Sequence, residues 1–222
     1  MKTKVNLNWI TPKADQNLAY MARVSNPKAT PDDPSEKLIK YLIDHKHWSP
    51  FEMVCLCVEI ETTRDIARQI LRHRSFHFQE LSQRYSEVSE EPEISPFVRL
   101  QDKKNRQSST YADDKIADAY WHDQQEEVWD KAYKNYELAL GYGMAKELAR
   151  KLLPEGLTKT HMYMQGTLRD WIHYVGIRQG PETQLEHQQI AYAIGLILEQ
   201  ECPEIASAAI SANIMRPFCV ND

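Results

Sequence analysis

The sequence contains few cysteines and no long apolar run, and each absence excludes a class of protein. The cysteines are Cys55, Cys57, Cys202 and Cys219. They are too few and too irregularly spaced for a disulfide framework, and no CxxC pair indicates structural zinc. The longest apolar stretches, 54–60 and 191–198, are far shorter than the roughly 20 residues that span a bilayer. We therefore expect reduced thiols and no membrane segment.

The sequence also lacks an excess of positively charged residues. The formal net charge is −5, whereas a dedicated nucleic-acid binder is usually basic. Any anionic ligand must then be held by a local cluster of basic residues. The first residues, MKTKVNLNW, lack the apolar core of a signal peptide. We therefore expect a cytoplasmic protein with neither a membrane nor a nucleic acid as partner.

Length and composition indicate one folded domain. A chain of 222 residues can bury a substantial core, and its contents of 42% hydrophobic and 27% charged residues are typical of globular proteins. We expect a single domain over residues 1–222, of the α+β class, dominated by helices with a small central sheet. Periodicity predicts helices over 17–24, 35–45, 111–148, 167–175 and 186–201, and a strand over 53–61.

Two features are predicted in the middle of the chain. The acidic, proline-bearing run 87–96 predicts a loop that leads into an extended piece at 97–100. The helix that follows carries large aromatic residues on one side, and we expect them to form a stripe in the core. These residues are Trp121, Trp129, Tyr133 and Tyr136.

The strand at 53–61 leads into a further helix. Thr62, with Asp65 three residues later, resembles a capping box that starts this helix. Apolar residues then repeat at helical spacing up to Leu71. The charged run RQILRHR, residues 68–74, is predicted at the far end of the helix, where cations suit the negative end of the macrodipole.

Functional residue types are densest in LRHRSFHFQELSQRYSE, residues 71–87. Arginine forks bind phosphate through two hydrogen bonds, and serine hydroxyls and backbone N–H groups complete such a site. This chemistry suits a nucleotide phosphate. On composition alone, a solvated helix end whose arginines only cap carbonyl groups is an equal alternative.

The order of these residues resembles a known family. Arg72, His73 and Arg74, followed after seven residues by Ser82, match the RHRx₇S signature of flavin-dependent thymidylate synthases. Further segments resemble the family in its order and nearly at its spacing. They are ARVS (22–25), HWSPFE (47–52), ARQ (67–69), RKLLP (150–154), TLRDWIHYVGIR (167–178) and QLEH (184–187). The resemblance covers residues 18–200.

The resemblance implies an activity and a substrate site. The implied reaction is the methylation of dUMP to dTMP, with 5,10-methylenetetrahydrofolate as carbon donor and FAD, reduced by NADPH, as electron carrier. No cysteine nucleophile is required. The implied dUMP-binding residues are Gln69, Ile70, Leu71, Arg72, Glu80, Leu81, Ser82, Gln83, Arg84, Arg150 and Arg178. Arg178 is the implied catalytic residue, because it matches an arginine that polarises the uracil ring and activates C5.

The resemblance also implies a flavin site. Its FAD-binding residues would be His47, Ser49, Arg72, His73, Arg74, Glu80, Thr167, Leu168, Arg169 and His173. No GxGxxG fingerprint occurs, so FAD would bind outside a Rossmann unit, between subunits of a homotetramer. The chain departs from the family's usual residues at His77, Gln83, Thr167 and His173. The Gln83 change affects a backbone approach to phosphate, and the changes at Thr167 and His173 affect flavin contacts.

Two other functions agree less well with the sequence. His73 and His77 have a spacing that places two metal ligands on one helical face, but an acidic partner at the right position is missing, so no metal site is predicted. A non-enzymatic domain that binds RNA through the RHR segment is disfavoured by the negative net charge.

Overall fold

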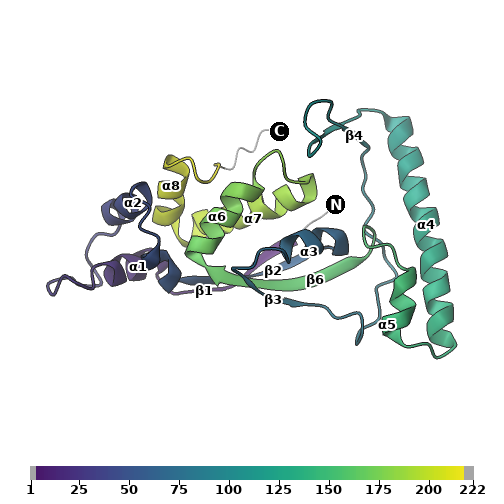
Figure 1. Ribbon diagram of the computed structural model, residues 1–222, viewed down its shortest axis with the longest axis horizontal. Helices are drawn as coiled ribbons and strands as arrows, with labels where there is room; N and C mark the ends of the chain where they lie inside the picture. The colour runs from purple at the N-terminus through teal and green to yellow at the C-terminus, as the bar shows by residue number, and fades with distance from the viewer. Residues whose placement is uncertain (1–3, 218–222) are drawn as a thin grey trace. The chain divides into compact units, whose positions relative to one another are not determined.

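Two compact units make up the chain. The structure is a computed structural model that describes residues 4–217, so Cys219 lies outside the described residues. Of these, unit 1 comprises residues 4, 61–73 and 79–162, and unit 2 comprises residues 5–60, 74–78 and 163–217. The observed helices outnumber the strands, which agrees with the predicted α+β class (Figure 1).

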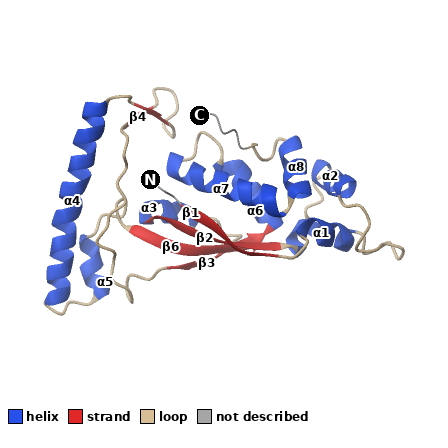
Figure 2. Ribbon diagram, turned by 180° about the vertical axis from the view of Figure 1, so that it is seen from behind, coloured by secondary structure: helices blue, strands red, loops and turns tan. Residues whose placement is uncertain are grey.

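Four strands form the main sheet in the order β1-β2-β6-β3 (Figure 2). Their bounds are Lys4–Ile10 for β1, Cys55–Thr63 for β2, His77–Glu80 for β3 and Lys159–Thr167 for β6. Neighbouring strands are antiparallel. Between β1 and β2, the side chain of Lys4 donates to Glu61 and that of Asn6 donates to Glu59, so residue numbers rise along one strand while they fall along the other. β2 is rich in aliphatic residues and confirms the strand predicted at 53–61, shifted by two residues.

Unit 2 contains most of the helices. They are α1 (Ala14–Ala22), α2 (Glu36–Asp44), the 3₁₀ helix η1 (Ser49–Met53), α6 (Leu168–Arg178), α7 (Leu185–Glu201) and α8 (Pro203–Ser211). The helices predicted at 35–45, 167–175 and 186–201 are confirmed, and α1 begins three residues earlier than predicted. Trp171 and Tyr174 of α6 are fully buried, and the indole of Trp171 donates a hydrogen bond to the Leu56 carbonyl at 3.1 Å.

A side chain from α1 caps α8. Asp15 is buried and accepts hydrogen bonds from the backbone N–H groups of Glu204 and Ile205, both at 3.1 Å. These N–H groups belong to the first turn of α8 and have no partner inside the helix. Asp15 thus joins segments that lie almost 190 residues apart in the sequence.

Unit 1 carries the longest helix. Its elements are α3 (Arg64–Ile70), β4 (Arg99–Gln101), β5 (Ser109–Tyr111), α4 (Lys115–Gly141), α5 (Lys146–Ala149) and the 3₁₀ turn η2 (Arg150–Leu152). β4 and β5 form an antiparallel ribbon with Leu100 opposite Thr110. The single helix predicted at 111–148 is wrong: α4 ends at Gly141, and Gly143 takes a positive φ of 82° that turns the chain into α5 (Figure 1).

The core of unit 1 lies under α4. Trp129 and Tyr136 are buried and Tyr133 is partly buried, as predicted, but Trp121 is 44% exposed and does not belong to the core. The loop predicted at 87–96 is confirmed. The backbone of this loop is hydrogen-bonded to the aromatic residues of α4: the Trp129 indole donates to the Glu90 carbonyl at 2.7 Å.

The start of α3 differs from the predicted capping box. Thr63, not Thr62, precedes the helix, and its hydroxyl donates to Asp65 rather than accepting a backbone N–H. The Thr62 hydroxyl is buried. Within the described residues, no helix is both long enough and apolar enough to cross a membrane.

Candidate active site

The RHR segment lies in a turn, not on a helix. α3 ends at Ile70, and the N–H of His73 donates to the Ile70 carbonyl at 3.1 Å, which closes a turn. Arg72 and Arg74 are exposed. The prediction that α3 continues through residue 74 is therefore wrong. Because His77 begins β3, His73 and His77 do not share a helical face, and the spacing argument for zinc fails.

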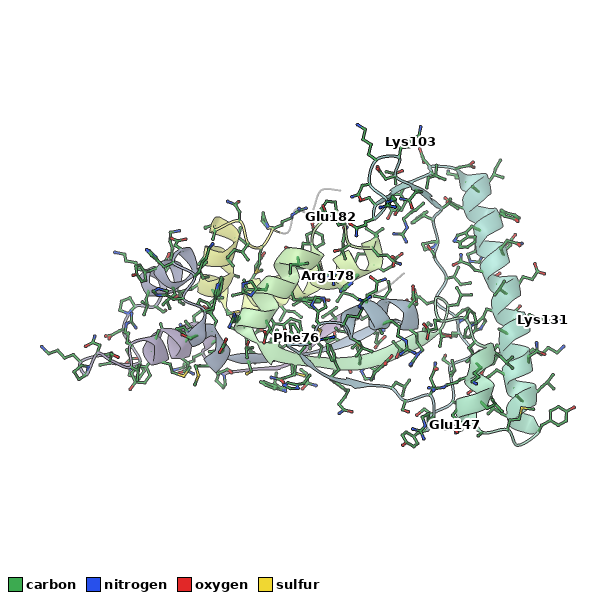
Figure 3. The ribbon with its side chains drawn as sticks, in the orientation of Figure 1. Phe76, Lys103, Lys131, Glu147, Arg178 and Glu182 are labelled. Atoms are coloured by element: carbon green, nitrogen blue, oxygen red, sulfur yellow. The ribbon has the colours of Figure 1, made fainter. Side chains whose placement is uncertain are left out.

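Phe76 anchors the middle of the signature in unit 2. Its ring is buried against Trp171 and Tyr174, at centroid distances of 4.6 and 5.7 Å. Gly166 on β6 makes room for this ring, since a Cβ there would lie 2.5 Å from it. Phe76 is thus the buried residue of the segment between α3 and β3. Figure 3 labels this residue together with Arg178 of the same unit.

The 80–84 loop, which begins at Glu80, the last residue of β3, is fixed by contacts within unit 1. The N–H of Leu81 donates to the His161 carbonyl at 2.9 Å, so the β3–β6 ladder extends one residue beyond the strand. The carbonyl of Ser82 then accepts from the N–H groups of Tyr85 and Ser86, which forms a turn. Gln83, at a position where the family commonly has glycine, is buried.

Glu80 at the start of this loop is held by two side chains. One oxygen, Oε1, lies 3.3 Å from Nη1 of Arg64 and accepts a hydrogen bond from the Thr160 hydroxyl at 2.9 Å. The same Nη1 of Arg64 donates to the Leu81 carbonyl at 3.3 Å. Neither Arg64 nor Thr160 was predicted as a site residue, because their partners are distant in sequence.

Several arginines of unit 1 lie near this loop. Burial lowers the pKa of Arg64, and the nearby Arg68 and Arg150 also lower it, against the opposite influence of Glu80 and Glu155. Arg150, in η2, is therefore within electrostatic reach of Arg64.

Arg84 is exposed at the end of the loop. Its Nε lies 3.2 Å from a carboxylate oxygen of Glu147 on α5. The exposed acid labelled on α5 in Figure 3 is this Glu147. Of the basic residues predicted in the segment 71–87, Arg84 thus has an acidic partner in unit 1.

Unit 2 holds most of the residues predicted for the flavin. His47 is exposed and lies near Tyr41 and His45, at ring-centroid distances of 5.9 and 6.1 Å. His173 packs edge-on against Trp48 at 4.5 Å. Burial lowers the pKa of His173, and the neighbouring Arg169 lowers it further, so the neutral imidazole is favoured.

Three of the predicted flavin residues lie at the start of α6. Thr167 is the N-cap, and its side chain forms a capping box with Asp170. Leu168 is fully buried, and its N–H donates to the Val54 carbonyl at 2.8 Å. Arg169 forms an ion pair with Glu52 of η1. The Thr167 side chain is therefore engaged in helix capping.

Arg178 lies in the last turn of α6 and is half-buried. One turn earlier, the buried Tyr174 hydroxyl lies 2.9 Å from Nε2 of the buried His187. Burial raises the pKa of Tyr174, and the positive charge of Arg178 opposes that effect. The guanidinium is thus close enough to the buried tyrosine to interact with it electrostatically.

Comparison with known proteins places this arrangement in a family. Residues 6–204 match the family model described as thymidylate synthase complementing protein. The chain is 46% identical over 196 residues to the probable flavin-dependent thymidylate synthase of Paramecium bursaria Chlorella virus 1, covering 88% of this chain and 90% of that protein. This chain belongs to the flavin-dependent thymidylate synthase family. The corresponding protein of Synechocystis sp. is also 46% identical over 192 residues, covering 86% of this chain and 87% of its own length.

Solved structures share the fold at lower identity. The UMP/dUMP methylase PolB from Streptomyces cacaoi, bound with 5-Br UMP, superposes with a TM-score of 0.86 at 22% identity and covers 97% of both chains. The same methylase bound with 5-Br dUMP has a TM-score of 0.86 at 23% identity. At this identity the likeness shows the fold alone.

The family's implied site residues fall into the two units as follows. Unit 1 contains Gln69, Ile70, Leu71, Arg72, His73, Glu80, Leu81, Ser82, Gln83, Arg84 and Arg150. Unit 2 contains His47, Ser49, Arg74, Thr167, Leu168, Arg169, His173 and Arg178. The substrate residues implied by the family thus gather in unit 1 around α3 and the 80–84 loop, apart from Arg178.

Proposed function

We propose that this chain catalyses the reductive methylation of dUMP to dTMP, with 5,10-methylenetetrahydrofolate as carbon donor and FAD, reduced by NADPH, as electron carrier. Membership of the flavin-dependent thymidylate synthase family supports this reaction. The single structural observation that carries it is the 80–84 loop, which is fixed at Glu80 and Leu81 and ends at an exposed arginine beside α5.

The phosphate of dUMP is assigned to unit 1. Ser82 offers a hydroxyl, and Arg84 and Arg150 offer guanidinium groups that suit phosphate oxygens. An incoming phosphate would compete with Glu147 for Arg84, and an exposed ion pair of this kind is weak enough to be exchanged. We assign Ser82 to binding, since a hydroxyl without an adjacent base is a poor nucleophile.

Arg178 is assigned to the uracil ring. A guanidinium keeps its proton at neutral pH, so its positive charge can stabilise the negative charge that develops when C5 acts as a carbon nucleophile. It lies one helical turn after Tyr174, whose buried hydroxyl is hydrogen-bonded to His187. No enzyme cysteine is needed for this activation.

The residues assigned to FAD fit a flavin outside a Rossmann unit. The cations of the exposed turn Arg72–Arg74 suit its pyrophosphate, and His47 and His173 offer aromatic rings. When bound, FAD supplies the electrons that complete the methyl group. Because Thr167 caps α6, we assign it a structural contribution to this site as well as a flavin contact. We also propose a cytoplasmic homotetramer whose subunits share each active site.

The test is release of tritium from [5-³H]dUMP. Purified protein is incubated with NADPH and methylenetetrahydrofolate, with and without added FAD. FAD-dependent release is expected, because C5 must lose its hydrogen when the methyl group forms. A folded protein that releases no tritium and does not turn yellow with FAD would overturn the proposed function.

A further inference from the structure

Arg64 occupies an unusual position for an arginine. It is the first residue of α3, at the point where β2 passes into the helix, and its side chain is only 8% exposed. Arginine is almost never buried unless it is paired. Its backbone N–H donates to the Thr158 carbonyl at 3.0 Å, so the residue is fixed at its main chain as well as at its side chain.

The contacts of Arg64 converge on the beginning of the 80–84 loop. Nη1 reaches both the Glu80 carboxylate and the Leu81 carbonyl, each at 3.3 Å. These two acceptors belong to consecutive residues, one through its side chain and one through its backbone. A single guanidinium therefore fixes the direction in which the chain leaves β3.

This arrangement is not explained by stability. Burying an ion pair removes both charges from water, and an apolar pair of similar volume is often equally stable or more so. Arg68 and Arg150 lie near enough to oppose the charge of Arg64, which adds to the cost. The buried pair instead fixes the position of the loop. The planar guanidinium can bond both the Glu80 carboxylate and the Leu81 carbonyl only in a narrow range of loop positions.

We propose that Arg64 is a positioning residue of the nucleotide site: it fixes Glu80 and Leu81 and thereby presents Ser82 and Arg84 to the phosphate of dUMP. This inference rests on the proposed function, because it concerns the same substrate. Arg64 itself does not touch the nucleotide in this scheme.

The experiment compares Arg64→Lys with Arg68→Lys. Both changes keep the positive charge but replace the guanidinium with a shorter ammonium side chain, which moves the donor away from the place that Nη1 of Arg64 occupies between Glu80 and Leu81. Arg64 is buried against the loop, while Arg68 is exposed and pairs with Glu155 at 3.0 Å. We expect Arg64→Lys to raise the KM for dUMP about tenfold, since hydrogen bonds of a charged group are lost. The kcat at saturating dUMP should change less than about twofold, and the affinity for FAD, to which the family also assigns Glu80, should fall less than the affinity for dUMP. Arg68→Lys should leave all three quantities within about twofold of wild type.

Several outcomes would overturn the inference. If Arg64→Lys only lowers the melting temperature and leaves the KM for dUMP unchanged, Arg64 is merely structural. If Arg68→Lys raises the KM equally, the effect does not come from the loop contacts. Arg64→Gln, which keeps a buried hydrogen-bond donor, gives the same comparison if Arg64→Lys does not fold. Wild-type protein that releases no tritium refutes the proposed function itself, whereas active wild type with an unaltered Arg64→Lys variant refutes only this inference.

Discussion

At the scale of single residues, the proposed chemistry depends on the side chain of Arg178. Replacing it with alanine would remove the positive charge that we assign to the uracil ring, where negative charge develops in the proposed reaction. We expect kcat to fall about 100-fold or more, as for other groups that stabilise developing charge. FAD binding, measured by flavin absorbance after gel filtration, should be almost unchanged. Loss of FAD with normal dUMP affinity would refute this assignment.

The Tyr174–His187 hydrogen bond is a second test at this scale. Both residues are fully buried, and Tyr174→Phe removes the hydroxyl that lies 2.9 Å from the His187 ring. We expect the free energy of unfolding, measured in urea, to fall by about 1–3 kcal/mol, because a buried polar group loses this partner. Tyr163→Phe is the matched control, since that hydroxyl donates to Glu59 at an exposed position and should contribute much less. Equal effects would contradict the role of burial.

The residues of the site were predictable to different degrees. The RHRx₇S segment could be recognised because its residues are close in sequence. Arg64 and Thr160 could not, because they act on Glu80 from positions 16 and 80 residues away, brought together only by the sheet. Phe76 carried no sequence signal of its own, although its ring is buried.

At the scale of elements, local pattern and long-range pairing contributed differently. α2, which has a strong apolar face, and α7 were predicted to within one residue at each end. The strands β1 and β6 and the helix α8 were not predicted, because β1 and β6 depend on partners that are distant in sequence and the first turn of α8 is capped by the distant Asp15. The long helix was predicted through 148, but a glycine with positive φ ends it early.

The Asp15 cap, which connects α1 with α8, predicts how pH affects the stability of the protein. Burial raises the pKa of Asp15, while the hydrogen bonds from Glu204 and Ile205 lower it. Because the pKa of Asp15 is higher in the folded protein than in the unfolded chain, the stabilising effect of this shift is fully present below the unfolded-state pKa near 3.8. It is lost as the pH rises through the folded-state pKa. Asparagine avoids this ionisation. We therefore expect Asp15→Asn to gain stability relative to wild type as pH rises from about 4 to 7.

Urea unfolding of both proteins at the two ends of this range measures the difference. Asp33→Asn is the control, because the pKa of Asp33 is lowered by hydrogen bonds from Thr30 and its stability effect has the opposite pH dependence. A constant difference between Asp15→Asn and wild type across the range would show that the Asp15 carboxyl does not change its charge there.

At the scale of the whole molecule, the reaction should proceed without any thiol. Burial raises the pKa of Cys55, Cys57 and Cys202, so the thiolate that a nucleophile requires is disfavoured at each of these three described positions. We expect a variant with all four cysteines replaced by alanine or serine to keep tritium release within about threefold of wild type. Abolished turnover in a folded, FAD-bound variant would contradict a mechanism without cysteine.

Flavin binding and assembly should also be coupled at this scale. If FAD binds through residues of several subunits, as proposed, the site should lose its ligand when the subunits separate. Sedimentation velocity with FAD should show a species of about four times 25.9 kDa. On dilution, flavin occupancy and tritium release per subunit should fall together, and added FAD should shift both transitions to lower protein concentration. A monomer that keeps FAD and full activity would place the whole flavin site within one chain.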